Sequence, residues 1–212
     1  MMSKLFGILE RVVAKLAPGR APFFIEAHLV KALMTIDYEG SVGRVKLSKT
    51  LGLGEGTIRT LVKHLENEKL IKISKAGIAL TSSGKKLTAN LKSRISKEIE
   101  IPKSSLTVGP FNVAILIKNA AGMIKGGLEQ RDAAIRVGAL GVTTLIFSRG
   151  KLNMPLVEED IFRNVPAIRE NLISKLKPQE NDVIIIGSAN DRLTAEFGAM
   201  SATIETLKVA EQ

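Results

Sequence analysis

The 212-residue chain has no cysteine and no tryptophan, and it contains only one tyrosine and two histidines. The absence of cysteine excludes disulfides, cysteine-ligated zinc, iron–sulfur clusters and thiol nucleophiles. His28 and His64 are too few for a multi-histidine metal site. The shortage of aromatic residues also argues against a protein that stacks single-stranded bases. The sequence therefore predicts no metal site and no cofactor.

Long apolar runs are missing as well. No stretch approaches the ~18 apolar residues that a membrane-spanning helix needs. The first residues, "MMSKLFGILERVVAKLAPGR", interleave apolar side chains with Glu10, Arg11 and Lys15, and so lack the continuous apolar segment of a signal peptide. They predict an amphipathic helix that packs on its own domain or on a second subunit. We expect a cytoplasmic protein with no membrane partner.

Acidic residues are scarce in the first half of the chain only. Residues 1–106 contain 19 Lys and Arg against 9 Asp and Glu, whereas residues 107–212 contain 12 of each kind. The whole net charge of +10 therefore belongs to the first half. A strongly basic domain indicates a polyanionic partner such as nucleic acid.

The stretch "LSKTLGLGEGTIRTLVKHLENEKLIKI" places three glycines between two helical patterns. The "GLG" at residues 52–54 predicts a tight turn between helices at about residues 45–51 and 55–67, because glycine tolerates positive φ angles. In the second helix Ile58, Leu61, Val62 and Leu65 form one apolar stripe. Opposite this stripe lie Gly56, Thr60, Lys63 and Asn67, with Arg59 and His64 on the flanks. This face is small, polar and cationic, which suits the DNA major groove.

The segment "LIKISKAGIALTSSGKK" follows this helix and alternates apolar with polar residues on both sides of "KAG". This pattern predicts a two-stranded hairpin. A further helix is expected after it, capped by Ser82 or Ser83. The preceding "PFFIEAHLVKALMTI" supplies the helix that packs under the pair. The order of helix, helix, turn, helix, hairpin and helix is that of a winged helix-turn-helix.

The free face of the second helix and the hairpin carry the side chains that could contact double-stranded DNA. They are Thr57, Arg59, Thr60, Lys63, His64, Asn67, Lys72 and Lys75. The alternative is that the winged helix is a protein-interaction module whose charges are only solvated. The basic excess of this half favours DNA.

A boundary is expected at residues 102–110, where "PKSSLTVGP" interrupts the pattern as a linker between domains at residues 1–101 and 111–212. The second half predicts the order β-α-β-β-α-β-α, with one helix at about residues 158–176 and a kink or restart at Val165 and Pro166. The expected fold class is α+β, in which a winged helix precedes a two-layer α/β sandwich with a mixed sheet.

Two stretches of the second half could bind a small anionic metabolite. "KGGLEQRD" opens a helix whose free N–H groups and Arg131 could hold an anion. In the alternative interpretation, the acidic residues suit the helix dipole and pair with Arg131. "IIIGSAND" ends a strand with polar residues, which could equally be helix caps. The candidate ligand residues are Glu129, Gln130, Arg131, Asp132, Ser188 and Asn190.

Two resemblances rest on these passages. "LGLGEGTIRTLVKHLENEKLI", the hairpin and "LTSSGKKL" resemble a broad family of bacterial and archaeal winged-helix regulators. Gly54 departs from that pattern, which usually has a serine cap there. "GGLEQRDAAIRVGALGVTTLIF" and "DVIIIGSAN" look similar to an archaeal family that joins a winged helix to an uncharacterised α/β domain. The resemblance implies a DNA-binding regulator, but it implies no ligand or activity for the second domain.

Three functions remain open at this point. The first is a DNA-binding transcriptional regulator, acting as a homodimer, whose second domain senses a ligand or mediates dimerisation. The second is an RNA or translation accessory protein. The third is an enzyme with a nucleic-acid docking module, but the second half has neither histidine nor cysteine, and isolated carboxylates such as Asp191 are a weak signal. We expect no catalytic residues.

Overall fold

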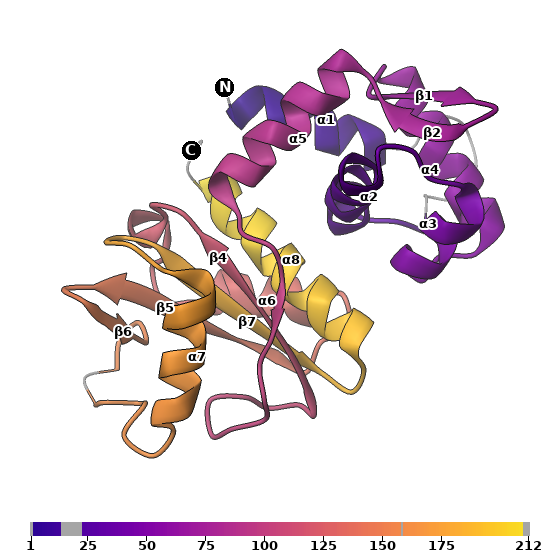
Figure 1. Cartoon of the computed structure of the whole chain (residues 1–212). Coiled ribbons are helices and arrows are strands. Elements are labelled where there is room, and N and C mark those ends of the chain that lie inside the picture. The colour runs from indigo at the N-terminus through magenta and orange to yellow at the C-terminus, as the bar shows by residue number, and fades with distance from the viewer. Residues whose placement is uncertain (1, 14–22, 158, 210–212) are drawn as a thin grey trace. The chain divides into compact units, whose positions relative to one another are not determined.

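The computed structural model describes residues 2–13, 23–157 and 159–209. The chain forms two compact units, residues 1–92 and residues 93–212 (Figure 1). The first unit is mainly helical and the second is built on a sheet. A helical unit is thus followed by a unit of helices and strands, which confirms the predicted α+β fold class.

The first unit is a winged helix-turn-helix, as predicted. Its helices pack around a core that includes Leu29, Leu33, Leu47, Ile58 and Leu61, all with no exposed surface. The elements are α1 (Met2–Val13), α2 (Glu26–Glu39), α3 (Arg44–Leu51), α4 (Glu55–Asn67), β1 (Ile71–Ser74), β2 (Gly77–Leu80) and α5 (Ser82–Arg94).

The turn between α3 and α4 depends on one glycine. Gly52 lies in the left-handed region at φ 65°, and its N–H donates to the carbonyl of Ser48. This conformation is open to glycine at little steric cost. Gly54, in contrast, precedes α4 in extended backbone at φ −64°. Of the glycines that the sequence offered for this turn, Gly52 is therefore the one whose backbone requires it.

The wing is the antiparallel pair β1–β2, in which Ile71 lies opposite Leu80 and Ile73 opposite Ile78. Val42, just before α3, adds an isolated bridge to Ile78. The sequence pattern did not indicate this third strand position, because one residue is too short to show an alternation. The bridge ties the wing to the start of the helix pair.

The second unit contains a five-stranded sheet with the strand order β3-β4-β7-β5-β6, and every neighbouring pair is antiparallel. Its elements are β3 (Ile99–Glu100), β4 (Phe111–Ile117), the 3-10 turn η1 (Ala121–Met123), α6 (Leu128–Ile135), β5 (Gly141–Ser148), β6 (Lys151–Asn153), α7 (Pro166–Leu176), β7 (Val183–Ala189) and α8 (Arg192–Val209).

The expectation of a mixed sheet was wrong. β4 and β5 do run in the same direction, as a strand–helix–strand unit requires, but β7 lies between them and is antiparallel to both. Because β7 separates them, β4 and β5 do not form the parallel pair that their order along the chain suggested. Strand order depends on contacts between distant segments, which local periodicity does not encode.

The two-layer expectation was also wrong, because helices cover both faces of the sheet (Figure 1). Ala114 and Leu116 of β4 share one core cluster with Ile168 and Leu172 of α7. Val113 points to the other face, where it packs with Ala195 of α8. α6 packs beside α8 and β5. The single helix α7 thus forms a third layer.

The boundary between the units lies before the predicted linker at 102–110. β3 pairs with β4 of the second unit, and Ile101 and Leu106 are buried in that unit's core. The segment expected to connect two domains is thus part of the second. Helix α7 begins at Pro166 rather than near residue 158, with proline at its start, where a missing N–H costs nothing.

Candidate nucleic-acid interface

The free face of α4 is exposed and cationic. Arg59, Thr60, Lys63 and Asn67 are exposed, and Thr57 is half-buried. The hydroxyl of Thr60 donates to the carbonyl of Gly56 at 3.1 Å. Within the described part of the chain, neither Arg59 nor Lys63 has an ion-pair partner. The two cations are therefore available to phosphates or base edges.

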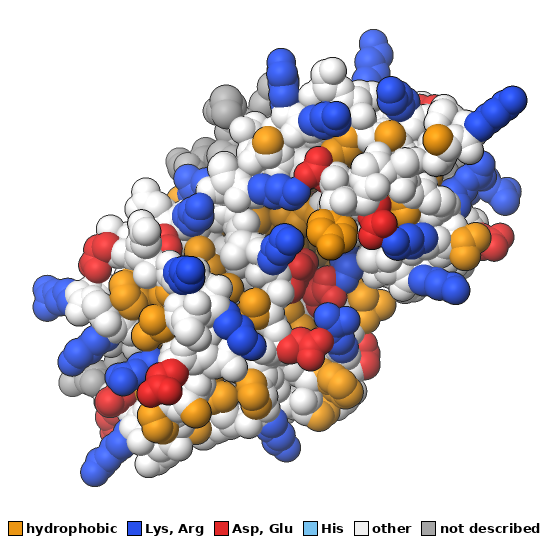
Figure 2. All heavy atoms as spheres, viewed as in Figure 1, with side chains coloured by type: hydrophobic (Ala, Val, Ile, Leu, Met, Phe, Trp, Pro, Cys, Tyr) orange, Lys and Arg blue, Asp and Glu red, His pale blue; other side chains and the backbone are white. Residues whose placement is uncertain are grey.

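The wing presents two further cations, Lys72 and Lys75, both exposed. The turn between its strands is held by the N–H of Ala76, which donates to the Ser74 hydroxyl at 3.2 Å, and by the Ser41 hydroxyl, which donates to the Ala76 carbonyl at 2.6 Å. Figure 2 shows Lys and Arg side chains projecting from this unit. The wing lysines thus stand on a fixed turn.

His64 is not part of the exposed face, contrary to the expectation. It is 5% exposed, and its Nδ1 atom lies 2.5 Å from the carbonyl oxygen of Val12 in α1. Its ring packs edge-on against Phe24, with the ring centroids 5.5 Å apart. The sequence placed His64 on a flank of α4 but could not show that α1 covers this flank. His64 cannot contact DNA directly in this fold.

Two cations of α3 were missed at the sequence level. Arg44 and Lys49 are exposed, whereas Lys46 of the same helix pairs with Glu39 at 2.7 Å. In helix-turn-helix proteins the first helix of the pair crosses the DNA backbone. The sequence could have indicated their exposure, because both residues lie off the apolar stripe formed by Leu47 and Leu51. Arg44 and Lys49 are therefore additional candidates for phosphate contacts.

In the second unit, the predicted ligand stretch at α6 is only partly accessible. Gly127 precedes the helix at φ 88°, and Glu129, Arg131 and Asp132 are exposed. Gln130 is 1% exposed, and its Nε2 donates to Thr206 Oγ1 of α8 at 3.1 Å. The Gln130 side chain therefore joins α6 to α8 inside the unit.

The second stretch, after β7, is also used internally. Ser188 is 1% exposed, and its hydroxyl donates to Asn112 Oδ1 at 2.7 Å, while Asn190 is exposed. The residue that caps α8 is Asp191, which accepts from the Thr194 N–H at 2.9 Å and from its hydroxyl at 2.7 Å. These bonds hold the pKa of Asp191 below its usual value. The cap expected at Ser188 or Asn190 is thus one residue further on.

The structure does not bring the two stretches together. Ser188 precedes the start of α8, whereas Gln130 contacts Thr206 near its end. Fourteen residues of helix separate Arg192 from Thr206, which is roughly 20 Å at ~1.5 Å per residue. A single small ligand cannot touch both stretches.

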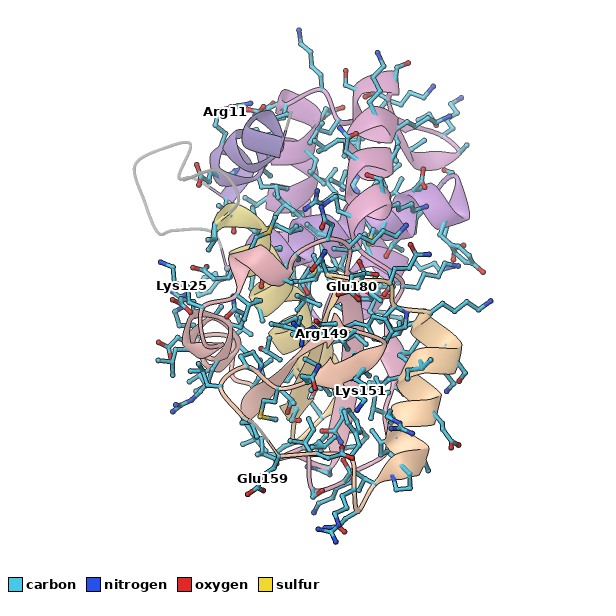
Figure 3. The ribbon with its side chains drawn as sticks, turned by 90° about the vertical axis from the view of Figure 1, so that its left-hand side faces the viewer. Arg11, Lys125, Arg149, Lys151, Glu159 and Glu180 are labelled. Carbon is cyan, nitrogen blue, oxygen red and sulfur yellow. The ribbon has the colours of Figure 1, made fainter. Side chains whose placement is uncertain are left out.

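A groove of about 480 Å³ lies elsewhere in this unit, lined by Gly150, Lys151, Arg169, Glu170, Ile173 and Ser174. Its rim is the β5–β6 turn, where Arg149 and Gly150 both have positive φ angles. The N–H of Arg149 donates to the Glu180 carboxylate at 2.9 Å, and both residues are labelled with Lys151 in Figure 3. None of the lining residues was a sequence candidate.

The described residues offer neither a metal-binding cluster nor a membrane-spanning helix. They contain no group of three or more His, Asp and Glu side chains placed to hold a metal ion. They also contain no helix that is both long and apolar enough to cross a membrane.

Comparisons with known proteins agree with the two units. Residues 29–95 match the family model described as the CggR N-terminal DNA binding domain, and residues 108–207 match a Domain of unknown function (DUF4443). The fold resembles the "Hypothetical protein PH0730 from Pyrococcus horikoshii OT3", with a TM-score of 0.62 and 25% identity over 85% of this chain and 98% of that one. No curated protein matches the chain. The chain therefore resembles archaeal regulator-like proteins that join a DNA-binding winged helix to an uncharacterised domain.

Proposed function

We propose that the protein is a transcriptional regulator that binds double-stranded DNA through α4 and the wing and has no catalytic role. The observation that carries this proposal is the exposed face of α4, where Arg59 and Lys63 stand without ion-pair partners in a domain that matches a DNA-binding family model. Acting on DNA, such a regulator would work in the cytoplasm.

The arrangement gives each cation a distinct role. The major groove admits one helix, so α4 would present Arg59 and Lys63 to base edges. Lys72 and Lys75 on the wing, with Arg44 and Lys49 on α3, would contact phosphates. Phosphate contacts release counterions, so affinity should fall steeply as the salt concentration rises. Base contacts should instead decide which sequence is preferred.

The test is a binding titration with the full chain. Duplexes are first selected from a random library, and affinities are then measured by fluorescence anisotropy at several salt concentrations. Lys63→Ala should weaken binding to the selected duplex by about 5- to 100-fold, corresponding to ~1–3 kcal/mol for one lost base contact. Lys175→Ala, which removes an exposed lysine of the second unit, is the matched control. Equal losses in both variants would contradict the proposal.

An RNA-binding role is tested in the same titration. The described exposed aromatic side chains are Phe23, Tyr38 and Phe111, and none of them lies on α4 or the wing. A protein that binds single-stranded RNA usually stacks bases on aromatic rings. We therefore expect unlabelled RNA of matched length to compete poorly with the selected duplex. RNA that competes better than the duplex would replace the transcriptional proposal with the RNA one.

For the second unit we propose a role in dimerisation, with ligand sensing as the second candidate. Leu91 of α5 and Met200 and Ile204 of α8 are buried within the chain and are not free for a dimer contact. The exposed apolar side chains of this unit include Val108, Phe111 and Leu140, of which Val108 and Leu140 flank Gly141 at one end of the sheet. Exposed apolar patches commonly mark contact surfaces.

Ligand sensing would use the start of α6, where Arg131 is exposed beside Glu129 and Asp132. Helix starts favour anions, and a guanidinium binds carboxylates and phosphates in two-pronged fashion. The check is a thermal-shift screen of anionic metabolites on the wild type and on Arg131→Ala. A metabolite that stabilises only the wild type supports a sensor. An Arg131→Ala protein that melts much lower and responds to no metabolite assigns Arg131 to structure.

A further inference from the structure

Helix α1 is an addition to the DNA-binding module. The family model matches residues 29–95, so α1 (Met2–Val13) lies outside it. In the structure α1 packs on α2 and on the recognition helix α4. Leu9 and Val12 on its inner side are 0% and 1% exposed. A helix from outside the matched residues thus covers one flank of α4.

The first link between α1 and α4 is a hydrogen bond from His64. The carbonyl of Val12 lies in the last turn of α1, where carbonyls have no partner within the helix. His64 Nδ1 lies 2.5 Å from that oxygen, and because a carbonyl can only accept, the imidazole N–H must donate. The bond is buried, and the buried ring of Phe24 packs edge-on against the imidazole. It therefore joins α1, α4 and the segment before α2.

The second link is an ion pair at the C-terminal end of α4. Arg11, labelled in Figure 3, donates to the Glu68 carboxylate through Nε at 3.1 Å and through Nη2 at 2.9 Å. Glu68 is the residue that ends α4. A guanidinium that engages both carboxylate oxygens fixes direction as well as distance. The two links lie one turn apart, at residues 64 and 68, so they restrain rotation of α4 as well as its translation.

The geometry of α4 makes this restraint matter for DNA. Its apolar stripe, which includes Ile58 and Leu65, holds one side against the core. His64 lies on a flank of that stripe, away from the exposed Arg59 and Lys63. A helix held on one stripe alone can roll. A roll of ~10° moves side-chain atoms that lie ~6 Å from the axis by ~1 Å, which is enough to misalign a hydrogen bond to a base edge.

We propose that α1 is a brace for the recognition helix, and that Arg11 and His64 are positioning residues for DNA recognition although neither touches DNA. The proposal rests on the proposed function. On this proposal, the discrimination between DNA sequences depends partly on the contacts that His64 and Glu68 of α4 make with α1. Loss of the brace should therefore reduce the preference for the selected duplex over an unrelated one, while binding to unrelated DNA, which depends on surface cations, persists.

The main test compares three full-length proteins in titrations with the selected duplex and an unrelated duplex. His64→Leu keeps a side chain of similar size but leaves the Val12 carbonyl unpaired, and the ratio of the two affinities should fall at least fivefold. His64→Gln keeps an N–H donor and should retain the ratio within twofold of the wild type. Binding to the unrelated duplex should change less than twofold in both. Circular dichroism must show folded protein at the assay temperature.

A second pair of variants covers the case in which His64→Leu fails to fold. Arg11 and Glu68 are partly solvent-exposed at their side chains, 58% and 27%, so their substitution leaves the core intact. Arg11→Glu should lower the affinity ratio, and combining it with Glu68→Arg should restore it. An unchanged ratio in folded Arg11→Glu and folded His64→Leu would overturn the brace and leave α1 as a stability element.

A third measurement separates this proposal from the proposed function. Hydrogen exchange at the amides of residues 64–68 is followed in the free protein. We expect exchange at least threefold faster in His64→Leu and in Arg11→Glu than in the wild type. If no duplex can be selected but exchange accelerates, the DNA-binding role fails and the brace remains as a structural link. If exchange is unchanged, the brace fails whatever the DNA result.

Discussion

At the residue scale, the buried face of α4 explains how one helix can serve both stability and recognition. Leu61 has no exposed surface, whereas Lys63, two positions later, is exposed. The hundred-degree turn between successive residues places them on different faces. The two functions of the helix can therefore be separated by single substitutions.

Leu61→Ala should lower the free energy of unfolding by ~2–5 kcal/mol, because it removes buried methyl groups and leaves a cavity. Lys63→Ala should change it by less than ~0.5 kcal/mol, as expected for an exposed site without a partner. Denaturant unfolding of the two variants and the wild type checks this. A larger loss in Lys63→Ala than in Leu61→Ala would mean that the orientation of α4 is wrong.

His28 predicts a pH dependence of stability. Burial, reinforced by the charge of Lys31, lowers its pKa from 6.5 to about 4. Its Nδ1 atom also accepts the N–H of Ile25 at 3.2 Å, which a protonated ring nitrogen cannot do. Because the folded state binds the proton more weakly than the unfolded state, the stabilisation is complete above pH 6.5 and is lost as the pH falls through 4.

Because the ring is only partly buried, the expected loss is roughly 1–3 kcal/mol between pH 7 and pH 4. The measurement is denaturant unfolding of the wild type and His28→Gln at both pH values, since glutamine does not titrate. The variant should lose less stability than the wild type over this interval. Parallel curves for the two proteins would show that His28 does not contribute to acid sensitivity.

At the element scale, the wing depends on a glycine that the turn itself demands. Gly77 has φ +116°, and a Cβ atom there would lie 2.8 Å from the Ser41 hydroxyl oxygen and 3.0 Å from the Val42 carbonyl oxygen. The bridge between Val42 and Ile78 leaves no room for the backbone to retreat. The close approach of these segments is what fixes the wing against the start of α3.

Gly77→Ala should therefore lower the free energy of unfolding by about 1–3 kcal/mol, through strain at positive φ and a backbone clash. Gly56→Ala is the contrast. That glycine lies within α4, where a Cβ atom would meet nothing within 4 Å. Alanine at this position should raise the stability by ~0.5–1 kcal/mol. Thermal and denaturant unfolding of both variants measure these changes. Equal changes in the free energy of unfolding for the two variants would contradict the geometry of the wing.

At the scale of the whole molecule, the net charge is unevenly divided along the chain. Residues 1–106 have a net charge of +10 and residues 107–212 have none. Near one end of its sheet, the second unit exposes Val108, Phe111 and Leu140, at 66%, 46% and 45%. Other large apolar side chains, among them Tyr38 and Leu156, are exposed elsewhere in the two units. The uneven charge suits a protein whose first unit binds a polyanion, and the apolar side chains at the end of the sheet suit contact with a protein surface.

We expect the full chain to be a homodimer in solution at micromolar concentration, and Phe111→Asp to shift it toward the monomer. A charged side chain cannot be buried in an apolar contact without a large desolvation cost. Light scattering coupled to size-exclusion chromatography measures the mass with and without the selected duplex. Tyr38→Asp, which changes an exposed aromatic residue of the first unit, is the control. A monomer under all conditions would remove the dimer.

The sequence by itself determined the local elements of the first unit, including the bounds of α4 at Glu55–Asn67 and the wing strands around residues 75 and 76. The hydrophobic period, the turn residues and the charge of a segment depend only on nearby positions, so they can be inferred from the sequence. The same reasoning predicted that Arg59 and Lys63 lie off the apolar stripe, and both are exposed.

Only the tertiary structure decided which faces were covered. It buried His64 under α1, enclosed Gln130 and Ser188 in contacts 76 residues apart along the chain, and inserted β7 between β4 and β5. It also added α7 as a third layer. Each of these outcomes depends on which segment, distant along the chain, packs against a given surface. The pattern along one segment indicates which side chains will be buried. Which other segment covers them is decided by the tertiary packing.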